Sequence, residues 1–375
     1  MTPVIVVIDD EAATLPLPAS CSAVRLNPTD SDFSEKFGPA VKSADLILLD
    51  HNLMVQQQIS LNAIDGASFV GHLRSWARKQ DVVMPPIAIF TSEDQAFAKE
   101  IPLVGPAVPL GGTFVGKEAR LAPALDVDWL INKDDDDAQS HVEQLALACS
   151  RLRVVAGDNK CTLAEIEKFL ELPQDVPWAE LAREHVARAR PPISEGAGFG
   201  SDVPRGVSPV LRWLLQRCIA YPGLLLSDLQ TAAALGVSVE TIAHLAANPG
   251  HSAWSKGLAD AIYQGPAHGM FARRWWAAGV DYAGWKLRDA LETEESTFEK
   301  LSGAHDVPNY ANQQIVLVDE DLLELELGDI ETAVQLHPRG WPSEANEPWA
   351  SIDLIKREPL LQAMLDPADK EMLFQ

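Results

Sequence analysis

Four runs of apolar residues stand out in the first part of the chain. They occupy residues 4–9, 45–50, 86–91 and 128–133, and each run is continuous rather than alternating. Short continuous runs are typical of strands that are buried on both faces of a parallel sheet. A weaker run at 22–26 predicts one further strand.

Helical periodicity is found between these runs. In residues 66–79, Phe69, Val70 and Leu73 recur at helical spacing, and Arg and Lys end the segment. Residues 134–153 predict a second amphipathic helix, whose acidic first turn complements the helix dipole. Strands and helices that alternate in this way predict an α/β fold with a doubly wound parallel sheet.

Beyond residue 155 the pattern becomes mainly helical. Thr162 and Glu165 have the spacing of a capping box and predict a helix start. From residue 313 the pattern is strand-like, and a short helix ends the chain. We therefore expect four parts: an α/β domain (1–155), a helical connector and linker (156–206), a helical domain (207–300) and a small acidic α+β segment (301–375).

Charge divides the chain in the same places. The formal net charge of −24 disfavours non-specific binding to nucleic acid or to an anionic membrane. Residues 200–290 carry 8 basic and 6 acidic side chains, whereas residues 291–375 carry 5 and 19. The acidic end is either a solvated face or an internal mask over the less acidic segment before it.

The cysteines and the first residues indicate the compartment. The cysteines are scattered without a CxxC pair, which favours reduced thiols over a disulfide framework or a zinc site; they are Cys21, Cys149, Cys161 and Cys218. The start MTPVIVVIDDE has no basic region before its apolar run, so it predicts no signal peptide. We expect a soluble cytoplasmic protein that does not contact a membrane.

Polar side chains stand where the predicted strands end. Asp9 and Asp10 close the first run, Asp50 the second, Thr91 the third and Lys133 the fourth. The carboxyl ends of parallel strands open on one edge of a sheet, where ligands of α/β proteins bind. We therefore expect these side chains to meet in one pocket.

Five motifs in this order carry a family resemblance. They are IDDE, LLLDHN, the DG at 65–66, IFTS and INK, and over residues 3–155 the chain resembles the receiver domain of two-component response regulators. The resemblance implies that Asp50 is a nucleophile that accepts a phosphoryl group. It further implies that Lys133 pairs with the phosphoryl oxygens and that Thr91 hydrogen-bonds one of them and reports its presence.

The resemblance also implies one Mg²⁺ ion. Its ligands would be Asp9, Asp10 and Asp50, with a main-chain carbonyl near Asn52 and waters completing the octahedron. The sequence departs from the family in two long intervals, after Asp50 and after Thr91. In addition, Asp134 stands where the family usually has a proline, so the usual cis peptide is not expected there.

We expect an atypical response regulator rather than an enzyme that acts on an external substrate. A histidine kinase would phosphorylate Asp50, and the C-terminal half would signal through a downstream protein, or the domain would store phosphate. A degenerate receiver that serves as a scaffold is an alternative. A hydrolase with an aspartate nucleophile is disfavoured, because the first strand ends in DDE and the nucleophile follows a later strand.

A helix-turn-helix pattern at 231–246 leaves a DNA-binding regulator as another alternative. Ala232, Gly236 and Ser238 have the spacing of the small residue, the turn glycine and the N-cap of that motif. The second helix has no Arg or Lys, so we expect a hairpin that only packs, and no specific DNA binding. Nearby basic residues could contact phosphates: Arg212, Arg217, Lys256, Arg273 and Arg274.

Two other patterns resemble binding motifs, but we interpret them as a loop and as part of the core. Residues 111–118 fit GxxxxGK, but Glu118 replaces the hydroxyl residue of a nucleotide-binding loop, so we expect a glycine-rich loop only. Residues 271–291 combine Trp, Tyr and Arg. This combination favours a core with capping arginines and leaves a protein-binding hot spot as the alternative.

Overall fold

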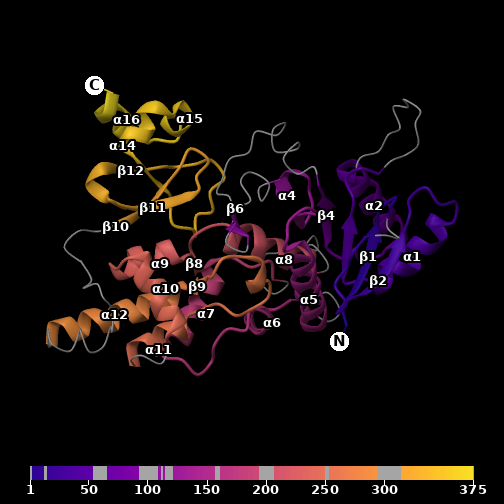
Figure 1. Ribbon diagram of the computed structural model, residues 1–375, viewed down its shortest axis with the longest axis horizontal. Coiled ribbons are helices and arrows are strands. Elements are labelled where there is room, and N and C mark those ends of the chain that lie inside the picture. Colours follow the sequence, from indigo (N-terminus) through magenta and orange to yellow (C-terminus); the bar gives the residue numbers. More distant parts are fainter. Residues whose placement is uncertain are drawn as a thin grey trace.

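A five-stranded parallel sheet organises the N-terminal part of the chain (Figure 1). Its order is β2-β1-β3-β4-β7, and it contains the five strands predicted within residues 1–155, including the weak run at 22–26. The strands are β1 (Val4–Ile8), β2 (Ser22–Leu26), β3 (Leu46–Leu49), β4 (Ile87–Thr91) and β7 (Trp129–Asn132). The computed structural model describes residues 2–11, 15–53, 66–92, 109–110, 113–114, 121–156, 161–193, 207–249, 253–293 and 314–374.

Helices cover both faces of this sheet, as expected for an α/β fold. Helices α1 (Phe33–Ser43) and α2 (Gly66–Gln80) pack on one face, where Ile8, Ile47 and Ile89 lie in their core. Helix α5 (Ala138–Ala156) packs on the other face. This helix begins four residues later than predicted, because the acidic residues before it form a turn in which Ala138 donates its N–H to the Asp135 carbonyl at 3.0 Å.

The connection between β1 and β2 differs from a regular βαβ unit. Its described residues contain no helix, and Leu15, Leu17 and Cys21 pack directly against the core that α5 shares with the helical part. That core is a single cluster of buried side chains, which includes Ile5 in β1 and Ala283 in the helical part. The helical part therefore covers sheet area that a helix after β1 would otherwise cover.

The middle of the chain is mainly helical. Its elements are α6 (Leu163–Phe169), α7 (Ala179–Arg188), α8 (Ser208–Trp213), the π-helix η2 (Leu214–Ile219), α9 (Asp228–Leu235), α10 (Val239–Ala247), α11 (Ala253–Ala259) and α12 (Ala277–Thr293). The capping box is confirmed: Thr162 and Glu165 exchange both side-chain-to-backbone hydrogen bonds at the start of α6. Most of the predicted linker at 190–206 lies outside the described residues.

Short elements complete the first two parts. Two-residue strands β8 (Leu225–Leu226) and β9 (Trp275–Trp276), which are far apart in the chain, pair antiparallel, and the 3-10 helix η3 (His268–Met270) precedes β9. Strands β5 (Pro109–Leu110) and β6 (Thr113–Phe114) form a second antiparallel pair, ahead of α4 (Leu121–Ala124). The glycine-rich segment 111–118 lies mostly outside the described residues.

The acidic end of the chain folds into a small α+β unit, as predicted. Its sheet has the order β11-β10-β13-β12. The elements are β10 (Gln314–Val318), β11 (Glu324–Asp329), η4 (Ile330–Thr332), β12 (Ala333–Gln335), β13 (Trp349–Ser351), α14 (Ile352–Arg357), α15 (Pro359–Gln362) and α16 (Pro367–Phe374).

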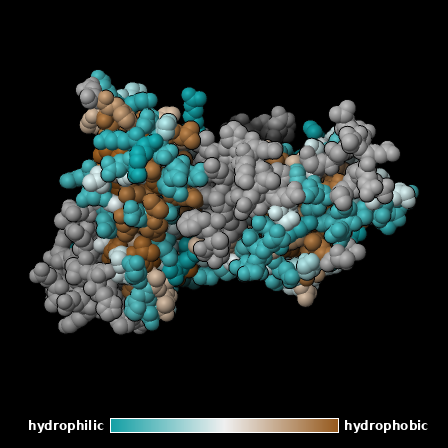
Figure 2. Space-filling view, turned by 45° about the horizontal axis from the view of Figure 1, so that its top comes forward, coloured by the Kyte–Doolittle hydropathy of each residue, from teal (hydrophilic) through white to brown (hydrophobic). Residues whose placement is uncertain are grey.

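This C-terminal unit rests on the helical part. The Asn346 N–H donates to the Pro222 carbonyl at 2.6 Å, and Arg217 pairs with Glu344 at 2.7 Å. On the face seen in Figure 2, hydrophobic side chains gather in a band on the left, where the C-terminal unit meets the helices. In the portion of the chain that the structure describes, no helix is both long and apolar enough to cross a bilayer.

Candidate functional site

Three strand ends bring the predicted acidic residues and the lysine together. Asp9 follows β1, Asp50 follows β3 and Lys133 follows β7, all on the carboxyl edge of the sheet. Lys133 Nζ lies 2.9 Å from Asp9 Oδ2 and 2.8 Å from Asp50 Oδ1. Both carboxylates are buried, with exposed fractions of 2% for Asp9 and 8% for Asp50. The structure brings these three of the predicted side chains together at one edge of the sheet.

Asp10 completes a set of three carboxylates. One carboxylate oxygen from each of Asp9, Asp10 and Asp50 lies within 4.8 Å of the others. Hard oxygen ligands of this kind are what Mg²⁺ prefers. The donor set therefore fits a magnesium ion. Asn52, the remaining predicted ligand position, is exposed two residues after Asp50.

Burial and the neighbouring charges have opposite effects on the pKa values of Asp50 and Lys133. Burial raises the pKa of Asp50, although the hydrogen bond and the charge of Lys133 partly oppose this shift. Burial alone lowers the pKa of Lys133, but its contacts with Asp50 and Asp9 outweigh burial, and the net result is a raised pKa. Lys133 is therefore firmly cationic, and its single charge contacts two of the three clustered carboxylates.

Backbone contacts fix the ends of β4 and β7. Thr91, the last residue of β4, is 1% exposed, and its carbonyl accepts the Lys133 N–H at 2.9 Å. Lys133 Nζ also lies 5.6 Å from the centre of the Phe90 ring. Thr91 is thus held beside the lysine, on the strand next to the one that precedes Asp50. The peptide bond from Lys133 to Asp134 is trans, as expected without the proline.

Gly66 contributes to this edge in a way that the sequence did not reveal. Its N–H donates to the His51 carbonyl at 2.8 Å, and a Cβ atom at this position would lie 2.2 Å from the Asp50 carbonyl oxygen. Only glycine allows helix α2 to start this close to the backbone of Asp50. The DG motif entered the family resemblance, but its packing role depends on a contact across the segment 51–66.

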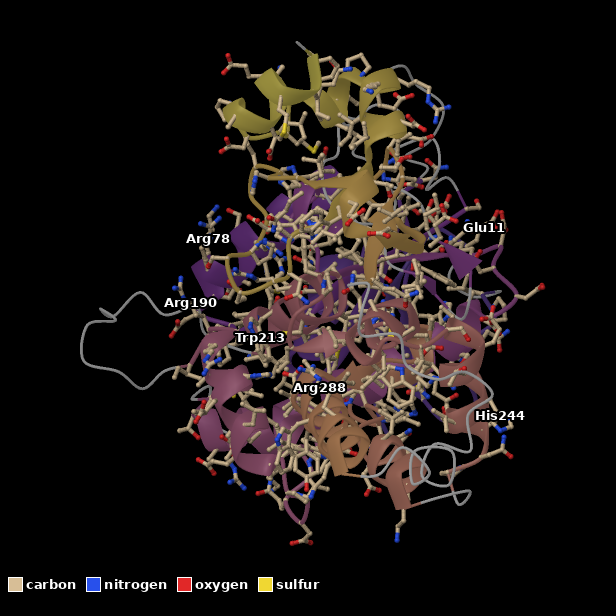
Figure 3. All side chains as sticks on the ribbon, turned by 90° about the vertical axis from the view of Figure 1, so that its left-hand side faces the viewer. Glu11, Arg78, Arg190, Trp213, His244 and Arg288 are labelled. Carbon is tan, nitrogen blue, oxygen red and sulfur yellow. The ribbon has the colours of Figure 1, made fainter. Side chains whose placement is uncertain are left out.

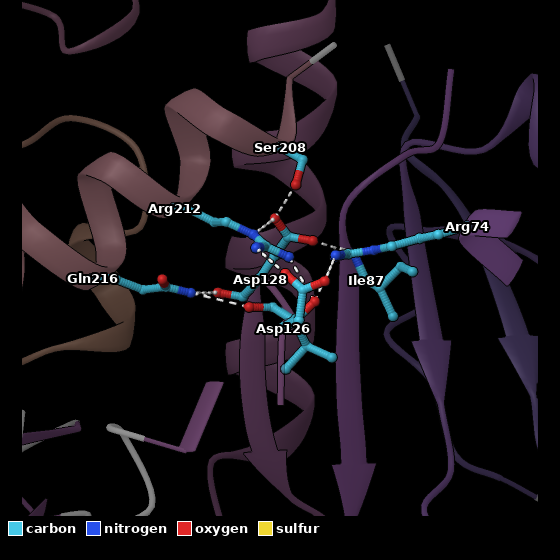
Figure 4. A network of polar contacts seen from close by, with 8 residues as sticks. Arg74, Ile87, Asp126, Asp128, Ser208, Arg212 and Gln216 are labelled. Carbon is cyan, nitrogen blue, oxygen red and sulfur yellow. Dashed lines mark hydrogen bonds and ion pairs between the residues drawn. The ribbon is translucent and has the colours of Figure 1, made fainter. Parts of the chain in front are cut away.

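A second polar cluster lies at the opposite, amino edge of the sheet (Figure 4). Asp128 is 1% exposed and accepts the Ile87 N–H at 2.7 Å, the Arg212 Nε–H at 3.0 Å and the Ser208 hydroxyl. Gln216 donates to the carbonyls of Val127 and Asp128, at 3.0 Å each. These contacts fasten α8 and η2 to the start of β7.

Asp126 extends the amino-edge cluster at its exposed side. It pairs with Arg74 from α2, and it accepts Arg212 Nη1 at 2.7 Å. The sequence marked Arg212 only as a possible phosphate contact. The carboxylates that engage it lie more than eighty residues away, so no local pattern could have identified them.

The helix-turn-helix pattern corresponds to a real helix pair. Gly236 adopts the left-handed conformation (φ 65°) after α9, and Ser238 caps α10 by accepting the Thr241 N–H at 3.2 Å. Thr241 itself is buried, and His244 lies at the outer edge of the molecule (Figure 3).

The basic residues near this helix pair are largely engaged in the fold. Arg217 pairs with Glu344 and Arg273 pairs with Asp228, while Arg274 is buried. Lys256 is exposed. In the segment 271–291, which is rich in Trp and Arg, Trp275 and Trp276 lie in the core, as expected from the interpretation of this segment as core.

Models of protein families and the curated proteins were both compared with this chain, and none matches it. The interpretation of the carboxyl edge therefore rests on its residues and their geometry.

Proposed function

We propose that the protein is an atypical response regulator in which Asp50 accepts a phosphoryl group from a histidine kinase. The observation that carries this proposal is Lys133 Nζ, which lies within 2.9 Å of both Asp9 and Asp50. One lysine between two buried aspartates, with Asp10 alongside, supplies a nucleophile, a cation for the phosphoryl oxygens and ligands for a metal.

The arrangement of the strands supports the same proposal. The order β2-β1-β3-β4-β7 corresponds to the flavodoxin-like order of doubly wound sheets. In such sheets the ligand site lies where the strand order reverses, which here is between β1 and β3. Asp9 and Asp50 follow these two strands.

The proposed reaction is a transfer between two side chains. A carboxylate oxygen of Asp50 attacks the phosphorus of a phosphohistidine, and the P–N bond breaks as the O–P bond forms. The electron pair of the broken bond stays on the imidazole nitrogen of the kinase. Lys133 would then donate hydrogen bonds to the phosphoryl oxygens, and the Thr91 hydroxyl would donate to one of them.

Asp9, Asp10 and Asp50, with the main-chain carbonyl near Asn52, would hold Mg²⁺ at this edge. When bound, the ion supplies positive charge that offsets repulsion between the carboxylates and the incoming phosphoryl group. We propose that output passes through protein contacts of the C-terminal half. An inactive scaffold is the alternative that the following experiment separates, whereas a phosphate store would be labelled on Asp50 in the same way as a signalling receiver.

The test is labelling with acetyl phosphate and Mg²⁺, read by intact-protein mass spectrometry. We expect the wild type to gain one phosphoryl group and Asp50→Asn to gain none. Asp45→Asn is the matched control, because Asp45 is a buried aspartate just before the same strand, at its other end. Labelling that persists in Asp50→Asn overturns the nucleophile assignment, and a wild type that is not labelled favours the scaffold.

We also expect no specific DNA binding by the full-length protein at physiological salt. Affinity for DNA depends on phosphate contacts and falls steeply with salt. Arg212, Arg217 and Arg273 already pair with carboxylates, and the net charge is −24. Mobility-shift titration of random operator libraries checks this, and enrichment of one sequence at nanomolar protein would reinstate the DNA-binding alternative.

A further inference from the structure

Arg274 is a buried cation with almost no partners. Its exposed fraction is 8%, although a guanidinium carries five N–H donors. Its hydrogen bond runs from Nη1 to the Arg273 carbonyl at 3.5 Å, at the limit of such a contact. Among the described residues, no carboxylate oxygen lies within 4.0 Å of its nitrogens. Burial lowers the pKa of Arg274, which is the sign of a charge that its surroundings do not fully compensate.

The charge of the neighbouring residue, Arg273, is fully paired. Arg273 donates to Asp228 through Nε at 3.0 Å and through Nη2 at 2.6 Å. Trp275 donates its indole N–H to the same carboxylate at 2.6 Å. Three donors therefore already engage Asp228, and this carboxylate forms its ion pair with Arg273 rather than with Arg274.

A cavity of about 230 Å³ lies beside Arg274, between the helical part and the C-terminal unit. Its wall is mostly apolar, formed by Leu225, Leu229, Val316, Val318, Trp341 and Pro348. The charged residues of the wall are Asp228, Arg273, Arg274 and Glu324. Ligand sites are commonly apolar cavities with a few placed polar groups.

The geometry points to this cavity as a binding site for a small organic carboxylate with an apolar body, whose charged end pairs with Arg274. A guanidinium offers two parallel N–H donors that match a carboxylate. A buried unpaired charge costs free energy, and a carboxylate ligand would remove that cost. An apolar cavity of about 150 Å³ is enough for benzene, so this one has room for a ring of that size and a carboxylate.

Glu324 is the side chain that would compete with a bound carboxylate for Arg274. It lines the cavity, and its charge acts on Arg274 from beyond ion-pair distance. A bound carboxylate would stand closer to the guanidinium than Glu324 does, but it would be repelled by that side chain. The charge of Glu324 should therefore weaken the binding of an anion without providing the pairing itself.

Benzoate is the probe, and isothermal titration of the full-length, metal-free protein is the measurement. Benzyl alcohol has the ring without the charge, and inorganic phosphate has charge without the apolar body. We expect benzoate to bind more tightly than either. Arg274→Gln should weaken benzoate binding roughly tenfold to a hundredfold, the value of a hydrogen bond to a charged group. Glu324→Gln should strengthen it.

Two controls locate the probe. Lys256→Gln removes an exposed cation and should leave binding unchanged. A second cavity shares both arginines and is lined by His268, whereas Trp341 lines only the first of the two. Trp341→Ala should weaken benzoate binding and His268→Ala should not; the reverse pattern places the probe elsewhere and overturns the proposal.

The proposal also fails if benzoate binds neither the wild type nor Glu324→Gln. Arg274 would then be a structural cation that Glu324 or water compensates. This outcome is independent of Asp50, so it leaves the phosphoryl-transfer proposal untouched.

Discussion

The aspartates at the two edges of the parallel sheet differ in how fully their charges are paired. At the amino edge, Asp126 and Asp128 face two arginines, Arg74 and Arg212. The buried member, Asp128, also accepts a main-chain N–H from Ile87. Each negative charge there has a positive partner.

At the carboxyl edge, three aspartates share one lysine. Asp9 and Asp50 both contact Lys133, and Asp10 adds a third carboxylate within 4.8 Å. This edge therefore carries an excess of negative charge, and burial raises the pKa of Asp50.

We propose that this difference separates a structural use of buried carboxylates from a functional one. A carboxylate that is paired with arginine and backbone N–H groups holds elements together. Carboxylates left in excess are held by the rest of the fold at a cost in free energy, and such clusters are typical of sites that bind ions or react. Three sets of variants test this distinction.

Asp128→Ala should have the largest effect on stability. It leaves the Ile87 N–H and the Arg212 guanidinium without their shared acceptor, so we expect a loss of about 2–4 kcal/mol in the free energy of unfolding. Urea unfolding followed by circular dichroism measures it.

Asp126→Ala is the matched control for this variant. Its side chain is 62% exposed, and exposed ion pairs contribute about 0–1 kcal/mol. If the two substitutions cost the same, the amino-edge cluster is not a buried structural pairing and the contrast between the edges is lost.

Asp10→Ala should have a smaller effect of opposite sign. Removing one of three clustered carboxylates relieves repulsion in the metal-free protein, so the free energy of unfolding should rise by on the order of 1 kcal/mol. Added Mg²⁺ should stabilise the wild type more than the variant. Thermal melts with and without Mg²⁺ measure both effects, and a variant that melts lower without metal would mean that Asp10 has a structural partner.

The arrangement at the carboxyl edge of the sheet could be predicted from the sequence, but the arrangement at the amino edge could not. The carboxyl edge follows from apolar runs that end in Asp9, Asp50 and Lys133, because the strand ends of a parallel sheet share an edge. Local signals also located the capping box at Thr162. Strand β2 was less evident, since an edge strand with only its last residue fully buried carries little periodicity.

The amino edge and the Arg274 cavity could not be predicted in this way. Their contacts join residues far apart in the chain, such as Arg212 with Asp128. The described residues between β1 and β2 contain no helix for the same reason, because the area that such a helix would cover is filled by the helical part. Propensity along the chain does not show which distant segment covers a sheet.

The smallest expected effect is a pH dependence that belongs to Asp50. Burial raises its pKa in the folded protein above the ordinary value of 3.8. Folding therefore favours the protonated acid. The contribution of Asp50 to stability is complete below about pH 3.8 and is lost as the pH rises through the raised folded-state pKa. The amide side chain of the Asp50→Asn variant does not titrate, so the variant should gain stability relative to the wild type over that window.

Urea unfolding of both proteins at a series of pH values from just above that ordinary pKa to neutrality measures the difference. Lys133 keeps its charge across this range because its pKa is raised, and Asp9 and Asp10 are present in both proteins. A difference that grows with pH means that burial and the neighbouring acids outweigh the lysine at Asp50. A difference that shrinks means that Lys133 outweighs them, so that Asp50 is a compensated carboxylate like Asp128. In that case the two edges would be alike, and the excess charge on which the phosphoacceptor assignment depends would be absent.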